Sequence, residues 1–352
     1  MMSFKIDDWE QAIIPGTATV LDAVKNLNDT GFRIALVVAE TGRFIGTVTD
    51  GDIRRHLLHG NDLSGNVKNI TNLGAIRVST EVSKSAIEKM AKQRGIFEIP
   101  VVNSFGKLVG LNLLRHKFNQ KFLKNKFVLM AGGLGTRMRP LTNDIPKPLV
   151  PINGVPMIQH IIEFARESGF RDFIVSVNYL GDKIKEFLKD GLWLGVKVSY
   201  VSETVPLGTA GGLSLIKDAT QDPMVICNAD VLSKLDFRDL LDFHTESGAF
   251  ATVAARVHEV QNPFGVLDIE QGRIVGVQEK PKHRSLVSAG IYVLSPEALK
   301  FIPFEKYLDI PEFLRSLISK NYSIVPYPIH EMWADVGTLD DLNRINELDN
   351  GE

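Results

Sequence analysis

The sequence of 352 residues has a single cysteine, Cys227. One thiol cannot form an intramolecular disulfide, and no cysteines and histidines have the spacing of a zinc site. We therefore expect neither a disulfide nor a structural zinc ion. Long hydrophobic runs are also lacking, because none approaches the roughly 18 apolar residues of a membrane span. The N-terminus, MMSFKIDDWEQ, is acidic and has no apolar signal-peptide core. These absences predict a cytoplasmic protein that does not enter a membrane.

An excess of charge of either sign is lacking as well. The chain carries 40 lysines and arginines against 42 aspartates and glutamates, for a formal net charge of −2. This balance argues against a nucleic-acid partner, because such binding rests on neutralising many phosphates. A local basic pocket for a small phosphorylated ligand remains compatible with it. With 44% hydrophobic residues the chain can build proper cores, and its length favours two domains.

Residues 1–120 contain a weak internal repeat. The stretch IALVVAETGRFIGTVTDGDIRRHL resembles FEIPVVNSFGKLVGLNLLRHKF, so that Val37 aligns with Val101 and Gly46 with Gly110. Each copy predicts a helix, a strand, a glycine-containing turn, a strand and a second helix. A repeated unit of this size usually buries its apolar face against its twin.

This half resembles a tandem pair of CBS domains, the Bateman module. GTVTDGDIRR carries the Thr-x-x-Asp pattern of that family as Thr49 and Asp52. In the family this aspartate holds the ribose hydroxyls of an adenosine nucleotide, so the resemblance implies an adenine nucleotide partner. The second copy has Leu113 and His116 at the corresponding places, which leaves at most one intact site. A helix N-cap formed by Thr49 and Asp52 without any ligand is the open alternative.

The basic stretch RHKFNQKFLKNK at 115–126 predicts a solvated helix end and a linker. We therefore expect two domains, 1–122 and 123–352. From Phe127 onwards the strand candidates FVLMA, DFIVSVN, VKVSYV, PMVICNAD and FATVAA alternate with helices such as MIQHIIEFARESG and GDKIKEFLKDG. This alternation predicts an α/β domain with a mainly parallel sheet. Ligands in such sheets bind at the carboxyl ends of the strands.

The stretch MAGGLGTRMRP at 130–140 follows the first of these strands. It begins like a dinucleotide fingerprint, but Met138 stands where the final glycine should be, and no Walker sequence follows. Its glycines let backbone N–H groups approach a phosphate closely, and Arg137 adds a permanent cation. Prolines on both sides of Lys147 stiffen the backbone of that residue. The pattern predicts a phosphate-binding loop with two cations.

The longer stretch GGLGTRMRPLTNDIPKPLVPINGVPMI resembles the signature of the sugar-1-phosphate nucleotidyltransferases. The resemblance continues in order through ETVPLGTAGGL, CNADVL, NPFGVL, QEKP, SAGIYVL and WADVGTLDDL, to the C-terminus. It implies a Rossmann-like domain with a mixed, mainly parallel sheet, preceded by the α+β CBS pair. It also implies a reaction in which a sugar-1-phosphate oxygen attacks the α-phosphorus of a nucleoside triphosphate, pyrophosphate leaves, and Mg²⁺ is the cofactor.

The same resemblance implies roles for single residues. Asp230 and Asp335 would hold the magnesium ion. Arg137 would grip the β- and γ-phosphates, and Lys147 would neutralise charge at the α-phosphate; these four would be the catalytic residues. The nucleotide would be bound by Ala131, Gly132, Gly133, Gly135, Thr136, Arg137, Gly208, Thr209 and Asp230. The sugar phosphate would be bound by Gly211, Glu279, Lys280, Ala289 and Gly290.

The motifs also bear on which base and which sugar the substrates contain. PKPLVP and PLGTAGG resemble guanylyltransferases, whereas thymidylyl relatives more often read Lys-Gln-Leu-Leu-Pro, so GTP is favoured. SAGIY, with Ser288 in place of the commoner asparagine, leaves the sugar open. A CBS pair before the transferase resembles guanylyltransferases of bacterial nonulosonic acid synthesis, such as that of legionaminic acid, which suggests glucosamine 1-phosphate or a related amino sugar.

Other hypotheses stay open at this point. One is a mannose- or glucose-1-phosphate nucleotidyltransferase with another base. Another, from a different class, is a non-catalytic nucleotide sensor, although a chain that had lost catalysis would have no reason to keep all four charged residues. CBS pairs commonly self-associate, so we expect a homo-oligomer.

Overall fold

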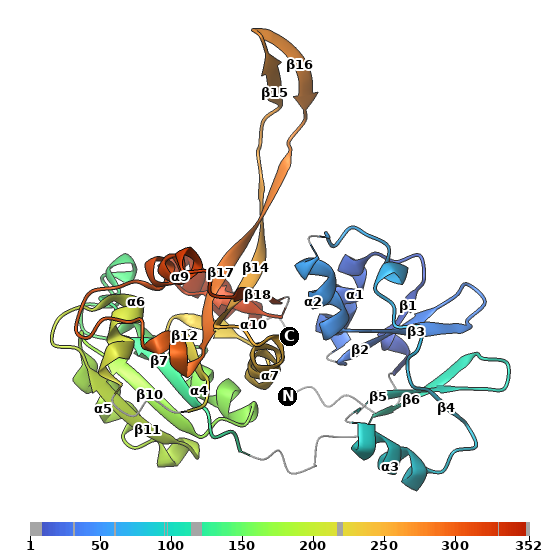
Figure 1. The fold of residues 1–352 in the computed structure, drawn as a ribbon, viewed down its shortest axis with the longest axis horizontal. Coiled ribbons are helices and arrows are strands. Elements are labelled where there is room, and N and C mark those ends of the chain that lie inside the picture. The colour runs from blue at the N-terminus through green and yellow to red at the C-terminus, as the bar shows by residue number, and fades with distance from the viewer. Residues whose placement is uncertain are drawn as a thin grey trace. The chain divides into compact units, whose positions relative to one another are not determined.

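The computed structural model describes residues 9–30, 32–59, 61–94, 96, 98–113, 122–216, 221–329 and 331–349. The chain divides into two compact units, Met1–Lys121 and Phe122–Glu352 (Figure 1). Within the described part of the chain, every helix is too short or too polar to cross a lipid bilayer.

The N-terminal unit contains short helices and two small sheets. Its elements are η1 (Trp9–Ala12), β1 (Ile13–Pro15), α1 (Val20–Thr30), β2 (Ile34–Val38), β3 (Phe44–Thr49), α2 (Asp50–Leu58), η2 (Val67–Asn69), β4 (Val78–Ser79), α3 (Lys84–Arg94), β5 (Glu98–Val102) and β6 (Leu108–Leu113).

The internal repeat is confirmed at the level of strand register. The sheets β1-β2-β3 and β4-β5-β6 each join one parallel pair to one antiparallel pair. Gly46 pairs with Val37 in the first sheet and Gly110 with Val101 in the second, and a bulge follows each pair. Leu36 of the first copy and Leu111 of the second belong to one buried apolar cluster, so the two copies bury their faces together. The helix expected to end the second copy falls at 114–121, outside the described residues.

The C-terminal unit alternates strands with helices. Its elements are β7 (Lys126–Ala131), η3 (Thr136–Met138), η4 (Lys147–Leu149), β8 (Pro151–Ile152), β9 (Val155–Pro156), α4 (Met157–Glu167), β10 (Asp172–Val177), α5 (Gly181–Leu188), η5 (Leu192–Leu194), β11 (Lys197–Ser202), α6 (Gly208–Gly211), η6 (Gly212–Leu215), β12 (Met224–Asn228), β13 (Val231–Ser233), α7 (Phe237–Ser247), β14 (Ala251–Gln261), β15 (Val266–Glu270), β16 (Arg273–Gln278), β17 (Lys282–Leu294), α8 (Pro296–Leu299), α9 (Ile310–Ser319), β18 (Ile324–Ile329), β19 (Trp333–Asp335) and α10 (Leu339–Asp349).

A seven-stranded sheet organises this unit, in the order β11-β10-β7-β12-β17-β14-β18. Strands β11, β10, β7 and β12 are parallel, and β17 runs antiparallel to both of its neighbours. Two buried clusters lie on its opposite faces, one containing Ile161 of α4 and Leu240 of α7, the other containing Phe313 of α9. The apolar runs quoted above form these strands because both of their faces are covered. The predicted mainly parallel α/β fold is confirmed.

Strands β14 and β17 extend beyond this sheet as a two-stranded ribbon (Figure 1). The pairing continues from Ala255 opposite Ser288 out to Gln261 opposite Lys282, and the hairpin of β15 and β16 forms the tip. The sequence analysis expected only the first part of β14, through Ala255. The extension lies outside the core, so it lacks the apolar run by which buried strands are found.

A buried histidine on α7 makes the stability of this unit dependent on pH. His244 Nδ1 lies 2.8 Å from Thr252 Oγ1 and Nε2 lies 3.1 Å from Ser295 Oγ. Burial lowers the pKa of His244 to about 4. The unfolded chain, in which the pKa is near its ordinary value of about 6.5, therefore binds the extra proton between these two values. We expect the free energy of unfolding to fall as the pH drops from about 6.5 towards 4, by at most about 1.4 kcal/mol per pH unit.

Urea titrations at pH 7.0, 6.0 and 5.0 test this expectation. His244→Gln should lose part of the pH dependence, whereas replacement of the exposed His283 by glutamine should leave it unchanged. Identical pH slopes in the wild type and in His244→Gln would show that the imidazole does not stay neutral in the fold.

Candidate active site

The glycine loop leaves the sheet at the end of β7, and buried residues and a side-chain hydrogen bond hold its backbone in place. Ala131 is buried, and Met138, in the turn that follows, is fully buried. Gly135 has a left-handed backbone with φ of +63°, and its carbonyl accepts a hydrogen bond of 2.7 Å from Thr142 Oγ1. Arg137 lies between these anchors and is exposed. The loop thus presents a cation to solvent from a fixed backbone.

Asp230 leaves the same edge of the sheet one strand away. Strand β12 lies beside β7 and is parallel to it, and Ala229 N donates to Met130 O at 3.1 Å. Lys147 Nζ donates to Asp230 Oδ2 at 2.6 Å, in an ion pair whose side chains are 11% and 28% exposed, respectively. The lysine that follows the glycine loop and the aspartate that follows β12 therefore meet, although 83 residues separate them in sequence.

Asp335 reaches this point through a small second sheet. Strand β13 pairs antiparallel with β19, with Val231 opposite Asp335, and Val336 N donates to Asp230 O at 3.0 Å. Asp335 keeps an exposed side, but partial desolvation raises its pKa. The charge of Asp230 raises this pKa further, whereas Lys147 and Arg137 lower it. The four predicted catalytic residues thus share one electrostatic environment.

Gly337 is a site residue that the sequence analysis did not single out. A Cβ atom there would lie 3.3 Å from both terminal nitrogens of Arg137, so the guanidinium packs against bare backbone. This contact brings the glycine loop to the segment that follows Asp335. The glycine of the WADVGT motif was the available signal, because a glycine beside a charged motif often marks a close approach.

Ala289 and Gly290 lie on β17, the other neighbour of β12. Trp333 Nε1 donates to Ala289 O at 2.8 Å, which ties β17 to β19. A Cβ atom on Gly290 would lie 3.0 Å from Asn228 Nδ2. Asn228 Oδ1 is buried and, within the described ranges, has no hydrogen-bond partner. These two sugar-site candidates are therefore brought near Asp230, together with an amide that the sequence analysis missed.

Glu203 joins the glycine loop to the PLGTAGG loop and was also missed. Its Oε1 accepts from Ser176 Oγ at 2.7 Å, and its Oε2 accepts from Leu207 N at 3.0 Å. A Cβ atom on Gly132 would lie 3.2 Å from the same Oε1. Gly132 of the glycine loop and Leu207 of the PLGTAGG loop, two segments expected around the base, therefore both lie against the carboxylate of Glu203. Gly133 stands in open space, and Thr136 begins η3.

The short helix α6 packs against the segment 306–309. Thr209 N and Oγ1 both donate to Asp309 Oδ1, at 3.1 and 3.3 Å. Gly208 has φ of +76°, and a Cβ atom on Gly211 would lie only 2.4 Å from Lys306 O. The absence of a side chain at Gly211 is therefore required by packing, whether or not a sugar lies near it.

Glu279 and Lys280 are not brought to the other site residues within one chain. Both follow β16 on the projecting ribbon, where Gln261 Nε2 donates to Lys280 O at 3.4 Å. From Lys280 to Ala289 the chain runs along β17 for about 30 Å at the usual rise of a strand. This separation is a difference from the sequence-based expectation that they join Gly290 at one sugar site.

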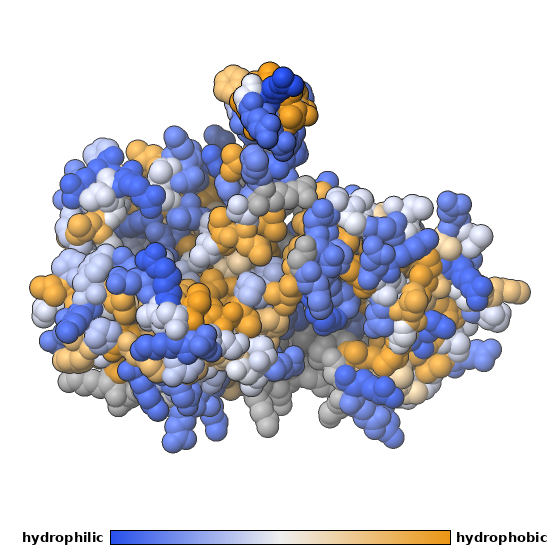
Figure 2. Space-filling view, turned by 45° about the horizontal axis from the view of Figure 1, so that its top comes forward, coloured by the Kyte–Doolittle hydropathy of each residue, from blue (hydrophilic) through white to orange (hydrophobic). Residues whose placement is uncertain are grey.

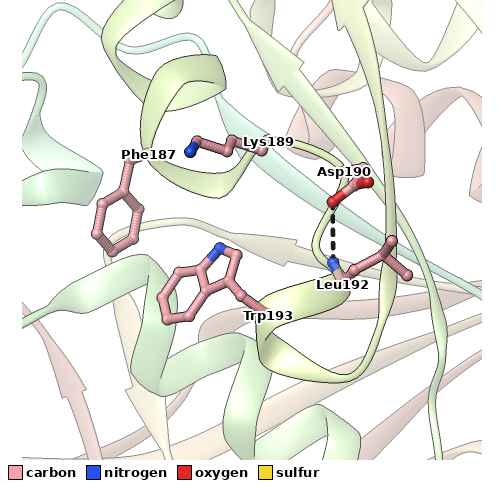
Figure 3. Close-up of a pocket in the computed structure, with 5 residues that line it drawn as sticks. All are labelled: Phe187, Lys189, Asp190, Leu192 and Trp193. Atoms are coloured by element: carbon pink, nitrogen blue, oxygen red, sulfur yellow. Dashed lines mark hydrogen bonds between the residues drawn. The ribbon is translucent and has the colours of Figure 1, made fainter.

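An open hollow of about 510 Å³ lies elsewhere on this unit (Figure 3). It is lined by Phe187, Lys189, Asp190, Leu192 and Trp193. Helix α5 runs back from the carboxyl end of β10, and the segment after it leads to the start of β11. The hollow therefore lies at the opposite edge of the sheet from Asp230, and it contains no predicted site residue.

The acidic pair fits magnesium by its chemistry. In the described ranges no three histidine, cysteine, aspartate or glutamate side chains lie close enough to hold a metal ion together. Magnesium commonly needs only one or two carboxylates and takes its other oxygens from water and substrate phosphates. Asp230 and Asp335 match that donor set. Cys227 is buried, and burial raises the pKa of its thiol, so it behaves as a small apolar residue.

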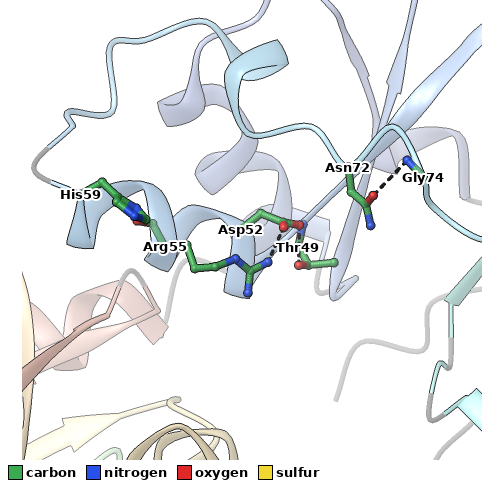
Figure 4. A network of polar contacts seen from close by, with 6 residues as sticks. All are labelled: Thr49, Asp52, Arg55, His59, Asn72 and Gly74. Atoms are coloured by element: carbon green, nitrogen blue, oxygen red, sulfur yellow. Dashed lines mark hydrogen bonds and ion pairs between the residues drawn. The ribbon is translucent and has the colours of Figure 1, made fainter. Parts of the chain in front are cut away.

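In the N-terminal unit, Thr49 and Asp52 form the N-cap of α2 (Figure 4). Thr49 N and Oγ1 donate to Asp52 Oδ2 at 2.8 and 2.7 Å. Arg55 Nη2 donates to Asp52 Oδ1 at 2.6 Å; its side chain is 66% exposed, against 13% for Asp52. Both carboxylate oxygens already have partners, which gives the capping role direct support.

Comparison with known proteins places these features in a family. The nucleotidyl transferase family profile matches residues 126–351, and the CBS domain profile matches residues 10–59. A probable mannose-1-phosphate guanylyltransferase of Oryza sativa subsp. japonica is 35% identical over 221 residues, which are 60% of this chain and 61% of that protein. A UTP--glucose-1-phosphate uridylyltransferase of Synechocystis sp. is 30% identical over 236 residues, with 61% of each chain covered.

A solved structure supports the same relationship. A putative glucose-1-phosphate thymidylyltransferase from Bacillus anthracis superposes with a TM-score of 0.52 at 27% identity, over 63% of this chain and 94% of that one. The chain spans about 61% of the length of the curated relatives named above. Since the family profile runs from the first strand of the C-terminal unit to its last helix and covers well over half of the sequence, the chain belongs to the nucleotidyl transferase family.

Proposed function

We propose that this protein transfers a guanylyl group from GTP to a sugar 1-phosphate and releases pyrophosphate. The observation that carries the proposal is the convergence of Arg137, Lys147, Asp230 and Asp335 at the carboxyl edge of β7 and β12. Two polyanions must meet for this reaction, so a site that cancels charge and fixes their geometry is the main requirement.

Each charged group has a place in this chemistry. A phosphate oxygen of the sugar 1-phosphate forms a bond to the α-phosphorus, and the bond from that phosphorus to the bridging oxygen breaks. Lys147 would neutralise charge on the α-phosphate, and Arg137 would stabilise the departing pyrophosphate. Asp230 and Asp335 would hold Mg²⁺, which when bound supplies further charge neutralisation on the phosphates.

The PLGTAGG loop meets Gly132 at Glu203, so backbone groups frame the space expected for a base, whichever base it is. The preference for guanine comes from the named relatives. Several relatives at 34–37% identity are named as mannose-1-phosphate guanylyl- or guanyltransferases. For the sugar, the CBS-containing architecture favours glucosamine 1-phosphate or a related amino sugar, as in legionaminic acid synthesis. The names of these relatives make mannose 1-phosphate the second candidate.

A substrate panel tests the proposal. GTP, ATP, UTP, CTP and dTTP are each combined with glucosamine, N-acetylglucosamine, mannose and glucose 1-phosphates in the presence of Mg²⁺, and pyrophosphate release is followed. We expect GTP to give the fastest release, and an Asp335→Asn preparation made in parallel shows the background. If no combination exceeds that background, the chain is not a transferase of this kind. A faster reaction with another base would remove only the guanine assignment.

We also propose that the first CBS copy binds an adenine nucleotide through Asp52. Arg55 occupies Asp52 Oδ1 from the exposed side, so a ribose hydroxyl would have to displace it. Calorimetry of the full chain with AMP should give binding that weakens at least about tenfold in Asp52→Asn. The Asn variant keeps an oxygen for the Thr49 cap. Arg55→Ala, which frees the carboxylate, should bind AMP at least as tightly as the wild type. Absence of heat in all three proteins would leave capping as the only role of Asp52.

A further inference from the structure

The tip of the projecting ribbon is a sheet of only two strands. β15 and β16 pair with each other and with no other strand in the described part of the chain. A two-stranded hairpin is marginally stable in water unless one of its faces packs against something. This hairpin is therefore expected to need a surface that covers one of its faces.

The two faces of the hairpin differ sharply in polarity. Leu267 pairs with Val277, and Ile269 pairs with Ile274, after a bulge that leaves Val275 on the same side. The opposite face carries Asp268, Glu270, Arg273 and Gln278. On that face Gln278 Nε2 donates to Asp268 Oδ2 at 3.1 Å, so the polar side has an internal hydrogen bond. Alternation of this kind is typical of a sheet whose apolar face is buried.

In this chain the apolar face is uncovered. Its five aliphatic side chains are 49–65% exposed, and Phe264, just before β15, is 74% exposed. None of them belongs to the buried clusters of the C-terminal unit. Figure 2 shows hydrophobic residues at the surface of the projecting tip. Contiguous apolar patches of this kind on folded proteins mark interaction sites.

We propose that a second copy of this chain covers the apolar face of β15 and β16. The five aliphatic residues include no charged group, so two copies related by a twofold axis meet without repulsion between like charges. A twofold axis brings the same patch of both subunits together, and this requires a self-complementary surface. A uniformly aliphatic face meets that requirement. A partner protein with a charged surface would find no ionic group on this face to pair with.

The apolar area comes close to what such an interface needs. A fully exposed aliphatic side chain offers roughly 60–120 Å² and an aromatic one about 150–250 Å², so the five aliphatic side chains and Phe264 together present about 400 Å² per tip at the observed exposures. A symmetric pair would bury about 800 Å² of apolar surface, and the backbone and polar rim would supply the rest of the ~1,000 Å² of a specific interface.

Two neighbouring substitutions on β16 test the proposal. Val277→Lys places a charge on the apolar face, and Gln278→Lys places the same charge on the polar face, beside Asp268. Light scattering after gel filtration of the full chain, 39.0 kDa per copy, gives the mass. We expect the wild type and Gln278→Lys to be oligomers of equal mass and Val277→Lys to have about half that mass. Circular dichroism checks that all three are folded.

Cross-linking provides a second measurement that does not depend on disrupting the interface. The only natural thiol, Cys227, is buried, so a cysteine introduced at the tip would dominate the reaction with a bismaleimide. Ile269→Cys should give a covalent dimer, and Asp268→Cys, on the other face, should give much less. A monomeric wild type, an unchanged mass in Val277→Lys, an equal loss of mass in Gln278→Lys, or equal cross-linking at both positions would each overturn the proposal. The first two would point to the other unit of the same chain, or to a different protein, as the covering surface.

Discussion

Replacement of Lys147 by methionine is expected to lower kcat for pyrophosphate release by about 10²–10³, the loss typical of removing one preorganised charge-stabilising group. Methionine keeps most of the length of the side chain and removes only the ammonium. Lys147 Nζ lies 2.6 Å from Asp230 Oδ2 and is largely buried, so this charge is held in place before any substrate arrives. A group fixed in this way does not have to reorganise as charge develops at the α-phosphate.

The control for this variant is Lys185→Met, which removes a lysine from the surface of α5, where it pairs with Asp182. It should retain wild-type kcat, because surface ion pairs contribute little and this one lies on another part of the fold. Steady-state kinetics with the best substrate pair, together with thermal unfolding, separates catalysis from folding. A Lys147→Met protein with wild-type kcat would show that this cation is not part of the transition-state environment.

Asp335→Asn is expected to lower kcat by at least about 10²-fold and to raise the Mg²⁺ concentration needed for half-maximal rate, because one of two carboxylates is lost. The same variant should be as stable as the wild type, or more so, in metal-free buffer. Desolvation and the charge of Asp230 raise the pKa of Asp335, so ionising this carboxyl costs more in the folded chain than in the unfolded chain. A neutral amide removes that penalty.

This pairing of lost activity with retained stability distinguishes a site residue from a structural one. Asp340→Asn, on the exposed side of α10, is the matched control and should change neither rate nor metal requirement. Rates are measured across a Mg²⁺ titration, and unfolding is followed in EDTA. Wild-type activity in Asp335→Asn, or a large loss of stability without a change in metal requirement, would contradict the assignment.

The central sheet and its loops could be predicted from the sequence because local patterns determine them. The apolar runs that became β7, β10 and β12 are buried on both faces, and each is short and bounded by polar or glycine-rich segments. Parallel strands place their carboxyl ends at one edge, so the glycine loop and Asp230 could be assigned to the same site before any coordinates were known.

The remaining parts depend on pairings between distant segments. The register of β13 with β19 sets Asp335 beside Asp230, and nothing local in either three-residue strand specifies it. Glu203 and Gly337 acquire their contacts only after folding, with Ser176 and Leu207 for the first and with Arg137 for the second. The long ribbon of β14 and β17 was missed because its exposed part lacks the apolar run of a buried strand, and the distance between Lys280 and Gly290 was missed with it.

The pairing of β13 with β19 has a consequence for synthesis of the protein. The glycine loop, Lys147 and Asp230 are translated well before Asp335. A nascent chain with β19 still inside the ribosome would hold three of the four charged groups and a β13 without its partner strand. Pairing between distant segments is also slow to form. The site therefore gains its fourth charged group only when β19 has left the ribosome and paired with β13.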